Sequence, residues 1–226
     1  MGARTRIGLL DLLLPERCLA CGGGEELLCT DCRAALVRVG GTLCARCGAP
    51  TAWPVERCAE CAGRRLAFAS ARAAVAYEGA ARMLVAAWKE RGLRRVSELA
   101  ADLVAELVPT PPVDALTFVP GDEDRTRWRG VNTAEGLARA LAARWDLPAG
   151  PLLSRTRSVP PQRRLSRVER RTNVREAFAP SPAPPRIALV DDVYTTGATA
   201  AAAATSLRRG GARVVHVVTF ARAVRR

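Results

Sequence analysis

From about residue 66 onward, short apolar runs alternate with longer segments in which apolar residues recur at every third or fourth position. Short runs rich in branched residues are typical of buried strands, and longer periodic segments are typical of amphipathic helices. The pattern predicts strands over 73–77, 115–119, 152–153, 187–190 and 214–220, and helices over 80–91, 97–107, 133–145 and 198–209. Strands that alternate with helices pair in parallel through right-handed crossovers, so we expect an α/β fold whose parallel sheet has flanking helices.

The first 65 residues have a different texture, dominated by cysteine. All eight cysteines of the chain lie here as four pairs, each separated by two residues. Each pair bends the chain so that two thiolates can face one ion, and two pairs complete the tetrahedral shell that Zn2+ prefers. We therefore expect two structural zinc sites, with no open coordination position for a substrate. The ligands are Cys18 and Cys21, Cys29 and Cys32, Cys44 and Cys47, and Cys58 and Cys61.

The spacing leaves the grouping of the pairs open. Sequential pairing is the simplest, because the loops at 22–28 and 48–57 are short, and a crossed arrangement is the alternative. A disulfide scaffold and an iron–sulfur site are the other readings of such cysteines. No segment approaches the roughly 20 apolar residues of a membrane helix, and 7–14 is too short for a secretion signal. We therefore predict a cytoplasmic protein without membrane insertion, whose reducing surroundings disfavour disulfides.

Positive charge is the next feature. The chain has 35 lysines and arginines against 22 acidic residues, for a net charge of +13, and Lys89 is the single lysine. Residues 154–178 carry eight arginines and two glutamates. This segment is either a solvated helix and loop or a lid that faces an anionic ligand. Aromatic residues make up only 4% of the chain, which argues against extensive stacking on nucleic-acid bases.

The segment 189–199 carries the most specific chemistry. A β-run leads into Asp191 and Asp192, and a turn of threonines and glycine then opens the helix predicted from residue 198. Backbone N–H groups at such a turn can hold a phosphate, and adjacent carboxylates can accept hydrogen bonds from sugar hydroxyls or approach Mg2+. Lys89 is either a compact phosphate ligand or an ordinary surface residue. The pattern is not a Walker loop, because the Gly-Lys-Ser/Thr signature is absent.

This segment resembles the phosphoribosyl-pyrophosphate (PRPP) loop of type I phosphoribosyltransferases. Together with the cysteine pairs, it makes the chain similar to the ComF family, which is associated with bacterial competence and DNA uptake. The resemblance covers nearly the whole chain. Its further matches are Leu12 to Pro15 before Cys18, Arg129-Gly130 followed by Asn132, and the stretch from Pro161-Gln162 through Leu165-Ser166, Glu169-Arg170 and Asn173 to Phe178.

The resemblance implies a role for each part of the site. Asp191 and Asp192 hold the ribose hydroxyls, directly or through Mg2+ bound with PRPP, and are expected to be catalytic together with Arg129. Arg129 and Gly130 face the pyrophosphate, and the arginine-rich segment closes as a lid over the reaction. The residues expected to wrap the 5-phosphate are Thr195, Thr196, Gly197, Ala198 and Thr199.

We therefore expect two units: a double zinc ribbon over 1–65, and a type I phosphoribosyltransferase-like domain over 66–226 with its lid at about 154–178. The expected function is that of a PRPP-dependent transferase with an undetermined acceptor, acting in DNA uptake or nucleotide metabolism. One alternative is a module that binds single-stranded DNA without turnover. Another is a sensor that reports PRPP to a partner, with proteins of the DNA-uptake machinery as candidate partners.

Overall fold

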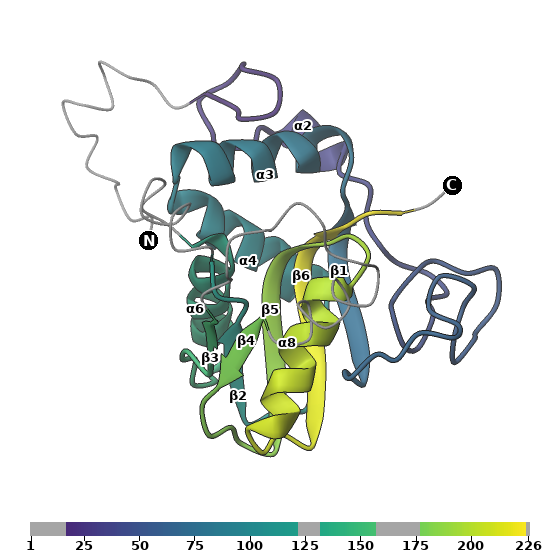
Figure 1. Ribbon diagram of the computed structural model, residues 1–226. Coiled ribbons are helices and arrows are strands. Elements are labelled where there is room, and N and C mark those ends of the chain that lie inside the picture. The colour runs from purple at the N-terminus through teal and green to yellow at the C-terminus, as the bar shows by residue number, and fades with distance from the viewer. Residues whose placement is uncertain (1–16, 122–131, 157–176, 225–226) are drawn as a thin grey trace, which may run out of the picture.

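A four-stranded parallel sheet in the order β1-β6-β5-β2 forms the centre of the computed structural model (Figure 1). The structure describes residues 17–121, 132–156 and 177–224. The strands are β1 (Ser70–Ala76), β2 (Ala115–Phe118), β5 (Arg186–Tyr194) and β6 (Val214–Arg222). A separate antiparallel pair is formed by β3 (Leu153–Arg155) and β4 (Phe178–Pro180).

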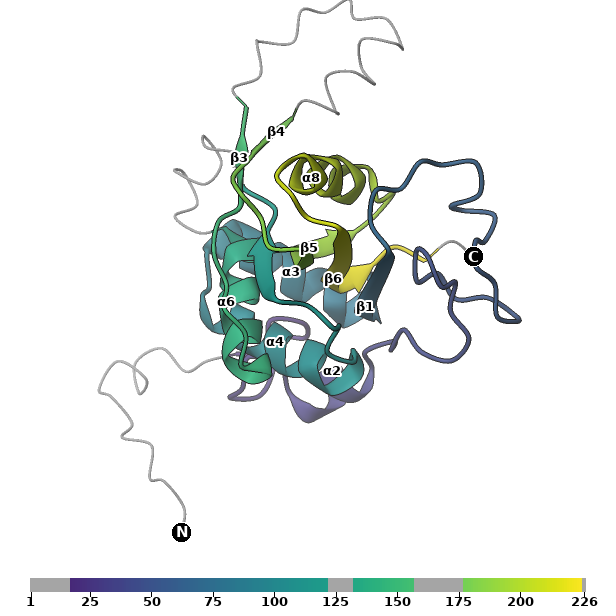
Figure 2. The same ribbon diagram turned by 90° about the horizontal axis from the view of Figure 1, so that it is seen from below.

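Helices cover both faces of the sheet. The described helices are α2 (Thr30–Ala34), α3 (Gly79–Arg91), α4 (Arg95–Leu107), α6 (Thr133–Trp145) and α8 (Ala198–Arg209). Figure 2 shows α8 on one face, with α4 and α6 on the other. In Figure 1, α3 runs across the end of the sheet at which the parallel strands finish. The expected α/β fold, with its parallel sheet, flanking helices and preceding four-cysteine module, is confirmed.

The two-sided cover explains why the central strands are apolar at consecutive positions. A parallel sheet between two helical layers buries both faces, so its strands need not alternate between apolar and polar residues. All four residues of β2 are buried, and residues 187–190 of β5 are 0% exposed. Small residues allow close packing above them: Ala203 and Ala204 of α8 are completely buried, and Gly136 of α6 lies against Ser97 of α4.

Strand β5 continues further than the sequence predicts. The apolar run suggested a strand over 187–190, but pairing with β6 continues through Asp191 opposite Thr219 and Tyr194 opposite Arg222. The reason is that β6 is equally long, so the backbone N–H and C=O groups of 191–194 find partners there. Because successive side chains of a strand alternate between faces, Asp191 and Asp192 point to opposite sides of the sheet.

The cysteine-bearing segment is attached to the free edge of β1. The Val39 N–H donates to the Ala74 carbonyl (2.9 Å) and the Ala76 N–H to the Val37 carbonyl (2.8 Å), so this segment adds antiparallel pairing to the sheet. Whether the chain divides near residue 65 into two folding units stays a prediction. Within the described residues, no helix combines the length and apolar character needed to cross a membrane.

Candidate metal centres and phosphate site

The eight cysteines gather into two separate clusters, grouped sequentially as the simpler of the two pairings expects. Within each cluster, the four sulfurs lie within 4.8 Å of one another. In the second cluster, the Cys44 and Cys61 sulfurs are 3.7 Å apart and those of Cys47 and Cys58 are 3.4 Å apart. A zinc ion bound at about 2.3 Å by four sulfurs separates them by about 3.8 Å, whereas a disulfide holds them at about 2.05 Å. The donor set and spacing fit structural zinc, and all eight cysteines are free thiols.

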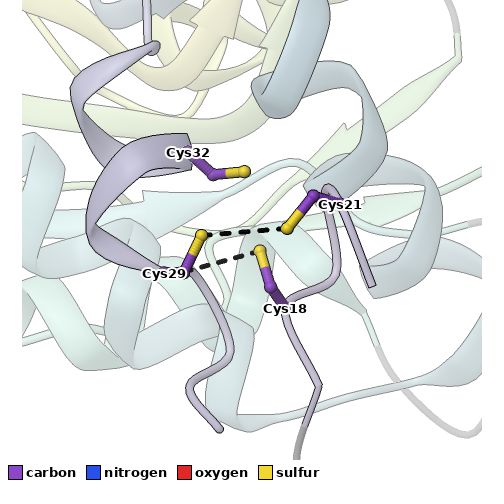
Figure 3. A group of neighbouring side chains, drawn as sticks. All are labelled: Cys18, Cys21, Cys29 and Cys32. Atoms are coloured by element: carbon purple, nitrogen blue, oxygen red, sulfur yellow. Dashed lines mark hydrogen bonds between the residues drawn. The ribbon is translucent and has the colours of Figure 1, made fainter. Parts of the chain in front are cut away.

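Figure 3 shows the first cluster, in which Cys18, Cys21, Cys29 and Cys32 turn their side chains toward one another. The Cys21 and Cys29 sulfurs are 3.8 Å apart, and the Cys29 N–H donates to the Cys18 sulfur at 3.5 Å. The short helix α2 begins just after Cys29 and carries Cys32. Cys21 is exposed, whereas three of the four cysteines of the second cluster are buried. The second centre is therefore the better shielded of the two.

At Cys44, backbone donors favour the thiolate form that binds metal. Burial raises the pKa of Cys44, but N–H groups of Cys47, Cys58 and Arg46 and a side-chain hydrogen bond with Cys61 outweigh it and lower the pKa to about 6. The Cys58 N–H lies 3.3 Å from the Cys44 sulfur. Because zinc binds thiolates, these donors stabilise the ligand in the state that the metal requires.

In each zinc centre, a glycine follows the first pair of cysteines, in a turn that we call the zinc knuckle. The glycines of the first and second knuckle, Gly22 and Gly48, differ in their surroundings. Gly22 and Gly48 both adopt positive φ angles, +77° and +68°. An added Cβ would meet nothing within 4 Å at Gly22, but at Gly48 it would lie 2.2 Å from the Ala71 carbonyl oxygen of β1. The second knuckle is pressed directly onto the sheet.

We expect Gly48→Ala to destabilise the zinc-loaded protein by about 3 kcal/mol, and the matched control Gly22→Ala by about 1 kcal/mol. Both variants carry the strain of an L-residue at positive φ, but only the first also forces a methyl group into backbone. Urea unfolding of the zinc-loaded variants measures the difference. Equal losses in the two variants would show that the second knuckle does not rest on β1.

Beyond the zinc centres, three elements converge on Asp192 near the carboxyl end of β5. Asp192 is 7% exposed, and its two carboxylate oxygens have separate partners. Lys89 Nζ of α3 lies 2.8 Å from Oδ1, and the hydroxyl of Thr133, the first residue of α6, donates to Oδ2. The single lysine of the chain is thus paired with one of the two predicted acids. These bonds fix the carboxylate of Asp192 in one orientation.

The neighbouring Asp191 is part-buried and has fewer hydrogen-bond partners than Asp192 among the described residues. Its Oδ1 accepts a hydrogen bond from the Asp192 N–H at 2.9 Å. Burial and the adjacent charge of Asp192 raise the pKa of Asp191 to about 7, although the Asp192 N–H, Lys89 and Arg155 act in the opposite direction. A carboxyl group in this state gains stability when a cation or hydroxyl donor binds its ionised form.

The predicted phosphate loop lies between β5 and α8. Gly197 precedes the helix with φ +72°, and Thr196 Oγ1 accepts from the Ala198 N–H at 3.4 Å. Thr195, Thr196, Ala198 and Thr199 are exposed. The first N–H groups of a helix have no partner within it, so this exposed turn can bind an anion. The structure thus brings the acids, Lys89 and the phosphate loop to one end of the sheet, while Arg129, Gly130 and most of the predicted lid lie outside the described residues.

Two contributors to this region were not predicted from the sequence. Thr133 is an ordinary first residue of a helix, and no local sequence pattern predicts its hydrogen bond to Asp192. Arg222 ends an apolar strand, is 1% exposed, and lies with its guanidinium 5.4 Å from the centre of the Tyr194 ring. The available signal for Arg222 was a charged residue that closes a mostly apolar strand.

A comparison with protein families identifies the cysteine-bearing segment. The double zinc ribbon domain model matches residues 9–62. Among solved structures, the glutamine PRPP amidotransferase of Bacillus subtilis, complexed with ADP and GMP, is similar over 54% of this chain and 25% of its own, with 23% identity and a TM-score of 0.41. At this TM-score, the family assignment depends on the sequence relatives.

Those relatives match the chain over nearly its full length. Competence protein F of Haemophilus influenzae is 27% identical over 224 residues, covering 92% of this chain and 97% of that protein. The DNA utilization protein YhgH of Escherichia coli K12 is 30% identical over 223 residues, covering 91% of this chain and 96% of that protein. Identity of this extent across both parts of the chain assigns it to the ComF family.

Proposed function

We propose that the chain binds PRPP with Mg2+ at the carboxyl end of β5 and acts as a phosphoribosyltransferase-type protein in DNA uptake or use. The observation that carries the proposal is the meeting of two features on one strand end. An acid pair, Asp191 and Asp192, lies four and three residues before Thr195, where an exposed turn of threonines begins at the N-terminus of α8. In open α/β sheets, ligands bind beyond the carboxyl ends of strands, where this site lies.

Different residues of the site bind different parts of the ligand. The turn over 195–199 receives the 5-phosphate, because its backbone N–H groups and threonine hydroxyls can donate hydrogen bonds to phosphate oxygens. Asp191 faces the ribose hydroxyls, since Lys89 and Thr133 already occupy both oxygens of Asp192. Bound Mg2+ would neutralise the charge that develops on a departing pyrophosphate, and Asp191 is the carboxylate placed to hold it. Arg155 supplies positive charge beside the acids, and its Nε donates a hydrogen bond to the Pro120 carbonyl at 3.0 Å.

The zinc ribbons have a structural role in this proposal. Each shell of four thiolates is complete, so neither ion can polarise a substrate. We place the zinc-ribbon unit at 1–65 and the PRPP-binding unit at 66–226. Eight metal-binding thiolates need reducing surroundings, which supports a cytoplasmic location.

Single-stranded DNA is the second candidate ligand. The net charge of +13 favours it, and the names of the Escherichia coli and Haemophilus relatives refer to DNA utilization and competence. Trp53 is 69% exposed in the second zinc module and offers a ring on which a base can stack. Proteins of the DNA-uptake machinery are the corresponding candidate partners.

Calorimetric titration of PRPP with Mg2+ into the zinc-loaded protein tests the first candidate. We expect a micromolar dissociation constant, with at least about tenfold weaker binding of ribose 5-phosphate or pyrophosphate alone, because each occupies only part of the site. An oligonucleotide titration at two salt concentrations forms the second arm. Failure of PRPP to bind, together with salt-sensitive oligonucleotide binding, would reject the PRPP site in favour of a DNA-binding module.

A further inference from the structure

A buried arginine connects the second zinc centre to the carboxyl end of the parallel sheet. The Arg222 side chain, at the last position of β6, is 2% exposed. Its Nη1 donates to the carbonyl of Cys47 at 2.7 Å, and its Nη2 pairs with Glu60 Oε2 at 3.2 Å. Cys47 is a zinc ligand, and Glu60 lies between the ligands Cys58 and Cys61. The guanidinium therefore contacts the chain segments of both cysteine pairs that form this metal centre.

The same guanidinium lies against the strand that leads into the phosphate loop. Tyr194 ends β5 and is paired in register with Arg222 of β6. The Arg222 guanidinium carbon is 5.4 Å from the centre of the Tyr194 ring, within the range of a cation–π contact. Phe68 contacts the same ring in an edge-on arrangement, with centroids 6.3 Å apart and planes at 81°. These contacts leave the phenol little freedom to change its orientation.

The phenol in turn supports the loop itself. Gly197 lies so close to Tyr194 that an added Cβ would be 2.2 Å from the Tyr194 hydroxyl oxygen. At φ +72°, Gly197 also aims the first N–H groups of α8. A displacement of the Tyr194 ring therefore changes the backbone on which anion binding depends.

We propose that the second zinc centre positions the phosphate loop, through Arg222 as a positioning residue and Tyr194 as the support beneath Gly197. The loop keeps its anion-binding shape only while the zinc shell holds the Cys47 carbonyl and Glu60 in place for the guanidinium. Loss of that zinc ion, or of the Arg222 guanidinium, makes the phosphate loop more mobile, although neither group contacts the loop directly. The nature of the anion rests on the proposed PRPP function, whereas the coupling itself does not.

Hydrogen exchange of the full-length, zinc-loaded protein tests the coupling without any ligand. We expect Arg222→Met to speed exchange of the amides in 196–199 by about tenfold, with a smaller increase in Glu60→Gln, which keeps the Cys47 contact. Arg222→Lys retains the charge but loses the planar two-sided contact, so its rescue should be incomplete. Tyr194→Phe, which removes only the hydroxyl, provides a variant that folds if Arg222→Met does not.

The matched control is Glu106→Gln. Glu106 holds the first zinc module through Arg33 (2.9 Å) and Arg38 (3.3 Å) and has no described contact with the loop. We expect it to leave exchange over 196–199 unchanged. Unchanged exchange in Arg222→Met and Glu60→Gln, with both zinc ions retained, would overturn the proposal, as would equal increases in Glu106→Gln.

Anion titration then separates this proposal from the PRPP function. PRPP with Mg2+ should bind Arg222→Lys about tenfold more weakly than the parent. Selective removal of the second zinc ion should give the same loss. A parent that binds no PRPP, but whose loop still loosens in Arg222→Met, would reject the ligand and keep the coupling.

Discussion

We expect Cys47→Ser to remove one of two zinc ions and to destabilise the protein by at least about 4 kcal/mol, and Cys21→Ser to remove the other ion at a cost of about 1–2 kcal/mol. The difference follows from what each centre holds. Cys47 is 2% exposed, its carbonyl accepts from Arg222, and the next residue rests on β1. Cys21 is exposed, and the ion pairs between this module and α4 lie on the surface, where each contributes little. Zinc content by a chromogenic chelator and thermal unfolding give the two quantities.

In a chain of this size, the expected loss for Cys47→Ser lowers the melting temperature by about 10 °C. Both variants must first show the loss of one zinc equivalent each, which makes them a matched pair. Similar melting temperatures for the two would contradict the unequal docking of the modules. Retention of both ions in either variant would contradict the assigned ligands.

If the proposed site binds PRPP, we expect Asp191→Ala together with Asp192→Ala to lower PRPP affinity by at least about 100-fold, because the double change removes the acceptors for ribose hydroxyls and Mg2+ and takes from Lys89 its Asp192 partner. Asp191→Asn alone should cause most of this loss, since among the described residues only one of the two Asp191 carboxylate oxygens has a hydrogen-bond partner. In Asp192→Asn, the effect should be smaller and should shrink further in the Lys89→Met background, where the charge pair is already gone. Calorimetric titration with PRPP and Mg2+ measures each variant.

The affinity of this site for PRPP should depend on pH. Burial and the charge of Asp192 raise the pKa of Asp191 to about 7. Since Mg2+ and hydroxyl groups bind the ionised form, PRPP binding should release a proton, and affinity should rise as the pH increases through about 7. Titration in two buffers with different ionisation enthalpies counts that proton. Affinity that falls over this range would contradict the role of Asp191.

Asp114→Asn is the matched control for the acid variants. Asp114 accepts from Arg186 Nε at 3.0 Å, which makes an acid–base pair on the first residue of β5, at the opposite end of the strand from the site. The variant should bind PRPP as the parent does. A loss comparable to that of Asp191→Asn would show that the acid variants act through the stability of β5 and not through the site.

The helices were the part of the fold that the sequence predicted most closely. Thr133–Trp145 and Ala198–Arg209 have the predicted bounds, because Asn132 caps the first through its side chain and Gly197 begins the second. The end of β5 was predicted four residues too early, since its last residues are polar or follow the acids. Their strand conformation depends on pairing with β6, which no local pattern announces.

Cysteine spacing by itself predicted two four-cysteine sites that fit zinc, because two thiolates three positions apart meet through a local turn. The turn after Asp191 and Asp192 likewise follows from neighbouring residues. Only the tertiary structure decided which groups surround these local units. Lys89 is 103 positions from Asp192, and Arg222 is 175 positions from Cys47. Such contacts depend on how helices and strands pack, so the partners of the acid pair and the link from zinc to the phosphate loop appear only in the folded chain.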